Sequence, residues 1–122
     1  MTIALDKKGF DALLDREEGI VFVDFWASWC APCRAFAPVF EAAAARHPEI
    51  TWAKVDTDHE RVLAGQVGIR SIPTLMAFRD GLLVLEHSGM VNGATLDQLV
   101  KDIRALDMAV VRAEIDAEQP DV

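Results

Sequence analysis

The chain has 122 residues, of which 52% are apolar and 26% are charged, and this size and composition indicate a single globular domain. Its 20 acidic residues outnumber its 12 basic residues, which gives a net charge of −8. Nucleic acids and anionic membranes are polyanions, so this charge argues against both as binding partners. The chain also has no apolar run near the roughly 20 residues that span a bilayer.

The start of the chain and its cysteine content both favour a cytoplasmic location. Residues 1–9 lack the basic start and apolar centre of a secretory signal. The chain has two cysteines, Cys30 and Cys33. In a cytosolic protein, a close cysteine pair more often serves catalysis or metal binding than structural cross-linking.

The first predicted element is a helix from about Lys7 to Glu17, capped by Asp6. A nearly continuous apolar run of strand-forming residues over Ile20–Trp26 predicts a central strand that is buried on both faces. Pro32 then stands where the next helix begins, because the first turn of a helix tolerates a missing N–H. That helix is predicted to run from about Cys33 to His47.

The remaining elements complete a mixed sheet. A strand over Thr51–Asp56 follows the helix, which implies a right-handed parallel crossover, and a short helix over about Asp58–Gln66 comes next. Strands over Thr74–Arg79 and Leu82–His87 flank Asp80-Gly81, a strong hairpin signal. The last helix is predicted to open with Thr95 and Gln98 in capping-box spacing. We therefore expect an α/β fold with a mixed sheet covered by helices on both faces.

The cysteine pair lies in the segment Trp29-Cys30-Ala31-Pro32-Cys33, at the predicted junction of strand and helix. A spacing of three places the two sulfurs on one helical face, within reach of a disulfide. The partial positive charge of a helix N-terminus favours the thiolate, which is the reactive form of cysteine. The pattern predicts that Cys30 is a nucleophile and that the pair makes and breaks disulfides.

The same spacing also occurs in zinc sites, so metal binding is the alternative. A closed zinc site needs four ligands, and the chain has no second C-x-x-C pair and no H-x-x-x-H pair. Its histidines, His47, His59 and His87, are scattered and are more typical of surface residues. We expect no metal site.

Asp24 is the second strong feature, because a carboxylate in the middle of a buried strand loses hydration. Lys54 interrupts the neighbouring strand in a similar way, so the two side chains are expected to approach each other beneath the cysteine pair. Perturbed carboxylates cluster at functional sites. The alternatives are a buried ion pair without a catalytic part, or a Lys54 side chain that reaches out to solvent.

Three further positions have both an ordinary and a functional interpretation. Pro73 stands at the start of a strand, where an X-Pro bond is usually trans. Gly89 follows the hairpin as a turn residue or as a point of close backbone approach. Trp29, beside Cys30, is a contact platform or a core residue.

Taken together, these residues closely resemble thioredoxins. The resemblance covers about residues 1–107 in order and spacing, and it lies in the active-site segment Val23–Arg34, in Ala53–Asp56, in Gly68–Thr74, in the Asp80-Gly81 hairpin and in Gly89. Phe36-Ala37-Pro38 and Gly68–Thr74 look most like the bacterial subclass that often carries an N-terminal zinc ribbon, which this chain lacks. The fold expected from the resemblance is the thioredoxin-like α/β fold.

The resemblance implies a catalytic set. Cys30 would be the exposed nucleophile that forms a mixed disulfide with a substrate, and Cys33 the buried thiol that resolves it. Asp24, with Lys54 nearby, would handle the Cys33 proton. Pro73 would be cis and would place the Ile72 backbone beside the sulfurs.

The resemblance also implies partners. The substrate-binding surface would comprise Trp29, Ala31, Pro32, Ile72, Pro73, Gly89 and Met90. Disulfide-containing proteins would be the clients, and a flavin-dependent thioredoxin reductase would be the electron donor, so no bound cofactor is expected. The chain departs from the common pattern at Ala31, Ser71, Ser88 and Met90, which bears on reduction potential and substrate preference.

Residues 108–122 extend beyond the typical end of the family and are expected to form a helical extension or tail to a domain over residues 1–107. Apolar residues continue into this extension at spacings of three and four: Leu96, Leu99, Ile103, Leu106, Val110, Ala113 and Ala117. Such a heptad-like stripe more often packs on its own domain than on a partner. A monomer is expected, with a dimer through the C-terminal helix as the alternative.

The predicted function is the reduction of protein disulfides through a Cys30–Cys33 dithiol–disulfide cycle. One alternative is a disulfide oxidase or isomerase on the same fold, which needs a more stable thiolate and a higher potential. The other is a non-catalytic module that binds a partner and does not need Cys30.

Overall fold

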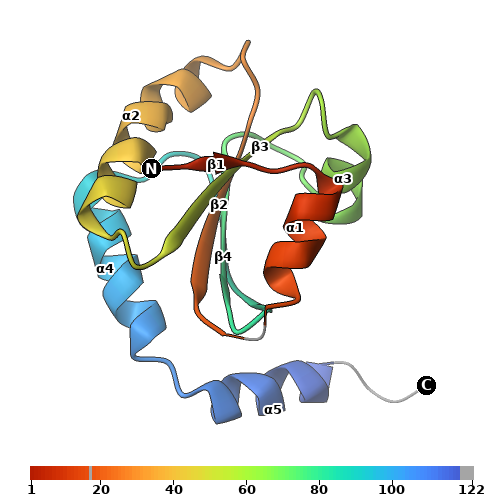
Figure 1. Ribbon diagram of the computed structural model, residues 1–122, viewed down its shortest axis with the longest axis vertical. Helices are drawn as coiled ribbons and strands as arrows, with labels where there is room; N and C mark the ends of the chain where they lie inside the picture. The colour runs from red at the N-terminus through yellow and green to blue at the C-terminus, as the bar shows by residue number, and fades with distance from the viewer. Residues whose placement is uncertain (17, 119–122) are drawn as a thin grey trace.

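The computed structural model describes residues 1–16 and 18–118, which form a five-stranded sheet with helices on both sides (Figure 1). The elements in chain order are β1 (Ile3–Ala4), α1 (Lys7–Leu14), β2 (Ile20–Trp26), α2 (Ala31–Arg46), β3 (Thr51–Asp56), α3 (Arg61–Gln66), β4 (Thr74–Arg79), β5 (Leu82–Ser88), α4 (Gly93–Arg104) and α5 (Met108–Glu118). None of the helices within these residues has the length and apolar character required to span a bilayer.

The sheet has the strand order β1-β3-β2-β4-β5, with β2 at its centre. β3 lies parallel to β2 on one side, and β4 lies antiparallel to β2 on the other. β1 continues the parallel half and β5 the antiparallel half. The mixed sheet and the parallel β2–α2–β3 crossover expected from the sequence are therefore confirmed.

The two faces of the sheet have separate cores. On one face, apolar side chains of α2 and α4 pack against Phe22 and Trp52, whose rings stack with centroids 4.6 Å apart. On the other face, α1 and α3 cover Val23 and Val55. Both sides of β2 are thus buried, which explains why its sequence is almost continuously apolar.

Several predicted element boundaries are wrong, and local hydrogen bonding explains the differences. α2 begins at Ala31, two residues earlier than predicted, because Cys30 is its N-cap. α3 begins at Arg61 instead of Asp58, since the carboxylate of Asp56 accepts hydrogen bonds from the backbone N–H groups of Asp58 and His59 in a preceding turn. α1 ends at Leu14, three residues before its predicted end at Glu17, with Asp15 as its C-cap; Glu17 itself lies outside the described residues.

The start of α4 is also corrected. Asn92 caps this helix, and its side chain accepts the backbone N–H of Thr95 at 2.8 Å. Thr95 therefore lies inside the first turn and is not the cap, so the Thr95–Gln98 capping box was a wrong prediction. Asn is one of the strongest N-cap residues, and Asn92 was the signal that identifies this start.

The apolar stripe of the C-terminal region does not follow one continuous helix. α4 ends at Arg104, and the side chain and carbonyl of Asp107 then cap α5 through Ala109 and Val111. Leu96 and Ile103 are buried in the domain's own core, whereas Val110 is 51% exposed. The helix break between residues 104 and 108 divides the heptad-like stripe between two helices.

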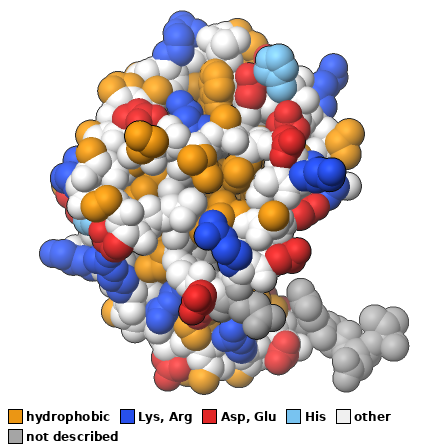
Figure 2. All heavy atoms as spheres, in the orientation of Figure 1, with side chains coloured by type: hydrophobic (Ala, Val, Ile, Leu, Met, Phe, Trp, Pro, Cys, Tyr) orange, Lys and Arg blue, Asp and Glu red, His pale blue; other side chains and the backbone are white. Residues whose placement is uncertain are grey.

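Acidic and basic side chains are intermixed over the face seen in Figure 2, and apolar side chains gather toward its middle. The net charge of −8 is therefore not concentrated in one acidic patch on this face.

Candidate active site

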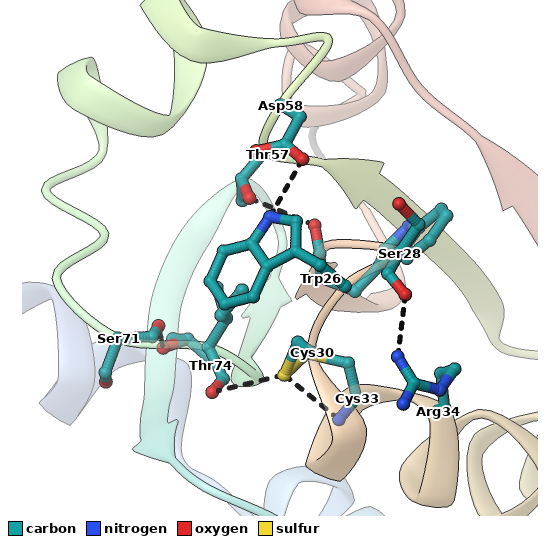
Figure 3. The surroundings of a disulfide bond; sticks show 11 residues. Trp26, Ser28, Cys30, Cys33, Arg34, Thr57, Asp58, Ser71 and Thr74 are labelled. Carbon is teal, nitrogen blue, oxygen red and sulfur yellow. Dashed lines mark hydrogen bonds between the residues drawn. A yellow bond between two sulfur atoms is a disulfide. The ribbon is translucent and has the colours of Figure 1, made fainter.

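The cysteine pair lies at the start of α2, immediately after the loop that leaves the central strand β2 (Figure 3). Cys30 and Cys33 form a disulfide, with their Cα atoms 5.2 Å apart. Cys30 is the N-cap of the helix, and its sulfur accepts the backbone N–H of Cys33 at 3.2 Å. An N–H group and a helix N-terminus both stabilise negative charge on a sulfur atom at this position.

The exposure of the pair differs from the expectation. Cys30 is 5% exposed and Cys33 is 2% exposed, so in the disulfide form both are buried, and Cys30 is not the exposed member that was predicted. The residues around them are accessible: Trp29 is 67% exposed, and Ala31 and Pro32 are also exposed. The disulfide thus lies at the base of a surface made by its neighbours.

A second segment closes over the sulfur of Cys30. The Ile72–Pro73 peptide bond is cis, as the resemblance implied. The carbonyl oxygen of Ile72 lies 3.7 Å from Cys30 Sγ. This contact contributes to the low exposure of Cys30 and brings the backbone of the half-buried Ile72 to the reactive sulfur.

Gly89 adjoins this segment from the end of β5. Its N–H donates to the carbonyl of Pro73 at 2.8 Å, and its φ of +95° favours glycine. A Cβ atom at Gly89 would meet no neighbouring atom within 4 Å, so the backbone conformation, and not close packing, accounts for the glycine. Met90 follows it and is 43% exposed.

Two residues that the sequence did not single out hold the loop before Cys30. The carboxylate of Asp58 accepts the indole N–H of Trp29 at 2.9 Å. The guanidinium of Arg34 donates to the carbonyl of Ser28 at 2.9 Å (Figure 3). Asp58 lies on the loop between β3 and α3, and no local sequence pattern pairs it with Trp29. Arg34 belongs to the segment that carries the resemblance.

A hollow of about 220 Å³ lies beside the loop. It is lined by Trp29, Thr57, Ala64, Ile69, Arg70, Ser71 and Ile72. The structure therefore brings Trp29 and Ile72 together, as predicted. Gly89 and Met90 do not line this hollow and adjoin Pro73 from the side of β5.

Asp24 lies on the sheet face that α2 covers, because strand alternation places it on the same side as Phe22. Asp24 is fully buried, and neither carboxylate oxygen has a hydrogen-bond partner within residues 1–16 and 18–118. This burial raises the pKa of Asp24 to about 6, against a smaller lowering by the charge of Lys54. A carboxyl group with this pKa exchanges its proton near neutral pH.

Lys54 is the register partner of Asp24 on β3, so the two residues lie side by side on adjacent strands. The two residues, both within the described part of the chain, form no ion pair within 4.0 Å. The ammonium group lies instead 5.0 Å from the ring centroid of Trp26, and Lys54 lines a separate cavity of about 630 Å³ with residues of β1 and the loop before α3.

The described residues contain no grouping of three or more His, Cys, Asp or Glu side chains that could hold a metal ion. His47 makes a structural contact at the end of α2, where its ring nitrogen lies 2.8 Å from a carboxylate oxygen of Asp97. His59 is 80% exposed at its side chain.

Comparisons with known proteins agree with this geometry. The family model described as Thioredoxin matches residues 1–105. A putative thioredoxin 2 of Streptomyces coelicolor is 41% identical over 118 residues, which cover 97% of this chain and 87% of the relative. Thioredoxin 1 of Synechococcus elongatus is 49% identical over 77 residues, or 62% of this chain and 72% of that protein.

Solved structures give the same result for the fold. The thioredoxin of Fasciola hepatica superposes with a TM-score of 0.75 at 33% identity, covering 84% of this chain and 98% of that one. A Malassezia sympodialis thioredoxin superposes with a TM-score of 0.74 at 28% identity, covering 83% and 91%. The chain belongs to the thioredoxin family, and with its Cys30–Cys33 pair it is a thiol–disulfide reductase.

Proposed function

We propose that Cys30 attacks client disulfides and that Cys33 resolves the intermediate. The Cys30 thiolate attacks one client sulfur, the client S–S bond breaks, and the other client sulfur leaves as a thiolate. Cys33 then attacks the Cys30 sulfur and releases the second client thiol. Two electrons pass from the dithiol to the client, and the Cys30–Cys33 disulfide seen in the structure is the oxidised product.

The observation that carries this assignment is the hydrogen bond from the Cys33 N–H to Cys30 Sγ at the N-cap of α2. In the dithiol form, the same donor and the helix N-terminus stabilise a thiolate at Cys30. Cys33 lies inside the first turn, so it lacks this donor arrangement.

Asp24 serves in this proposal as the acceptor of the Cys33 proton. It lies on the face covered by α2, it has a pKa of about 6, and its oxygens are not occupied by other hydrogen bonds within the described residues. An ideal general base has a pKa near the working pH, which this burial provides. Lys54, on the neighbouring strand, favours the ionised form of Asp24.

Client chains bind in this proposal across the exposed residues around the disulfide. Trp29, Ala31 and Pro32 form one side, and the backbone of Ile72 pairs with an extended client segment. The hydrogen bond that the indole N–H of Trp29 donates to the carboxylate of Asp58 holds the indole in position. Gly89 and Met90 continue the surface on the side of β5, and the carbonyl of the buried Pro73 accepts the N–H of Gly89 beneath them.

The catalytic cycle requires an electron donor. The oxidised protein must be reduced again, and we propose a flavin-dependent thioredoxin reductase as the electron donor. No bound cofactor takes part in this scheme. We place the protein in the cytoplasm as a monomer that contributes to redox homeostasis and to electron transport toward disulfide-containing clients.

Trapping of the mixed disulfide tests the assignment. Cys33→Ser, reduced and mixed with an oxidised client protein, should accumulate a covalent complex that dithiothreitol releases, because the resolving thiol is absent. Cys30→Ser is the matched control and should accumulate none. A complex formed equally well by Cys30→Ser, or by neither variant, would show that Cys30 is not the attacking thiol.

A further inference from the structure

Met90 is the one residue of the proposed client-binding surface that carries an oxidisable thioether. We propose that Met90 is a modification site, at which hydrogen peroxide forms the sulfoxide and so weakens the binding of protein clients. This inference rests on the proposed function, since it assigns a role to the same surface. It arises from the exposure of Met90 and from the anchoring of the residues on either side of it.

The backbone on both sides of Met90 is fixed. Gly89 donates its N–H to the carbonyl of Pro73, which follows the residue in contact with Cys30. Val91 packs against the core cluster formed by α2, α4 and the sheet. Met90 lies between these anchors and remains 43% exposed, so its side chain is presented at the surface next to the reactive segment.

The other sulfur-containing residues are less exposed than Met90, lie away from the proposed client-binding surface, or have no free sulfur to oxidise. Met76 is 2% exposed within the core on the α1 and α3 side. Met1 is 94% exposed but precedes β1, at the opposite edge of the sheet from β5, and Met108 opens α5. Cys30 and Cys33 have no thiol to oxidise while they form the disulfide.

The oxidation of Met90 requires only the thioether and hydrogen peroxide. The thioether attacks a peroxide oxygen, the O–O bond breaks and an S–O bond forms. The sulfur loses two electrons, and the peroxide is reduced to water. The product replaces a flexible apolar side chain by a polar one. A sulfoxide oxygen that loses its hydration against an apolar client side chain costs free energy, so client affinity should fall.

The experiment uses the disulfide form of the full chain, in which peroxide cannot consume the cysteines. The protein is treated with hydrogen peroxide, its peptides are examined by mass spectrometry, and it is then reduced and assayed. The KM for insulin reduction should rise by about fivefold, which corresponds to the modest cost of burying one polar group. The rate with a small aromatic disulfide, which does not reach Met90, should stay unchanged.

Met90→Leu is the matched control, because it keeps an apolar side chain of similar volume and keeps every other methionine. Each protein is compared with its own untreated sample, and Met90→Leu should show no peroxide response. Treatment of the oxidised parent with methionine sulfoxide reductases should restore the original KM.

Three results would overturn the proposal. One is a Met90 that stays unoxidised under conditions that oxidise Met1, and another is an oxidised Met90 with an unchanged KM for insulin. A third is an equal loss of activity in Met90→Leu. Failure of the proposed function is a separate observation, because the untreated parent would then reduce neither insulin nor the small disulfide.

Discussion

At the scale of single residues, the buried carboxyl group of Asp24 lowers the stability of the fold when it ionises, and the same burial gives it a pKa suited to proton transfer. Its carboxyl group is fully buried and lacks a hydrogen-bond partner within the described residues. Its pKa is raised from 3.8 to about 6 by desolvation. Ionised carboxylates are poorly solvated in such a site, so the folded protein binds this proton more tightly than the unfolded chain does.

Asp24→Asn should therefore be more stable than the parent at neutral pH. An aspartate whose pKa is raised by folding destabilises the protein once it ionises, so the parent loses stability as the pH rises from 3.8 to about 6 and stays lower above that. The shift corresponds to a gain of up to roughly 3 kcal/mol for the variant at pH 7, and this gain should shrink toward pH 4. Urea unfolding of the disulfide forms across this pH range measures it, and a gain that does not depend on pH would contradict the assignment.

The same substitution tests proton transfer. Asp24→Asn should slow insulin reduction by roughly 10- to 100-fold between pH 6 and 8. This loss is at or below the usual contribution of a general base, because water can still accept the Cys33 proton in the variant. The parent rate should fall as the pH drops through about 6, and the variant should lack this inflection. Equal rates for the two proteins across this range would exclude Asp24 as the acceptor of the Cys33 proton.

At the scale of elements, the cap of α4 offers a direct comparison of two positions. Asn92→Ala should reduce the free energy of unfolding by about 1 kcal/mol, because its side chain satisfies the N–H of Thr95. Thr95→Ala is the matched control, since Thr95 offers only its backbone N–H to the cap, and it should change stability much less. Denaturant unfolding of both variants measures the difference, and a larger loss at Thr95 would mean that the cap lies there.

β2 was predictable from sequence because its apolar run over Ile20–Trp26 is typical of a strand buried on both faces. β4 and β5 were predictable because they flank the Asp80-Gly81 hairpin signal. β1 was not predicted, because it has two residues and is defined by pairing with Ala53 and Lys54 far along the chain. The starts of α2 and α4 were predicted two or three residues too late, because the N-cap residues Cys30 and Asn92 fix where these helices begin.

The site could be predicted to the extent that it follows from strand register and local spacing. The pairing of Asp24 with Lys54 follows from two adjacent strands, and the disulfide follows from the spacing of its cysteines. The bond between Trp29 and Asp58 depends on how two loops meet in space, which local sequence does not encode. The low exposure of Cys30 likewise depends on the distant Ile72 carbonyl.

At the scale of the whole molecule, the described residues of α5 include none that is buried, and its half-buried Val111 and Ile115 line a hollow of about 220 Å³ together with Leu83 and Val84 of β5. The guanidinium of Arg79 donates to the carbonyls of Ile103 and Leu106, so the turn that precedes α5 is held without the helix itself. We propose that residues 1–107 form the catalytic domain.

Deletion of residues 108–122 should leave insulin reduction unchanged, because the active site lies on α2, β4 and the loops around them. Light scattering should give the mass of a monomer both before and after the deletion, since the apolar stripe is divided between α4 and α5. A dimeric full-length chain that becomes monomeric after the deletion would establish α5 as an interface.

The reduction potential of the Cys30–Cys33 couple tests the central claim that the whole molecule works as a reductase. Equilibration with glutathione mixtures, followed by quantification of the dithiol and disulfide forms, gives its value directly. We predict a potential below that of the cytosolic glutathione pool, which is roughly −220 to −260 mV by extraction. A potential of about −120 to −180 mV, typical of disulfide oxidases and isomerases, would contradict a reductase function and the cytoplasmic location.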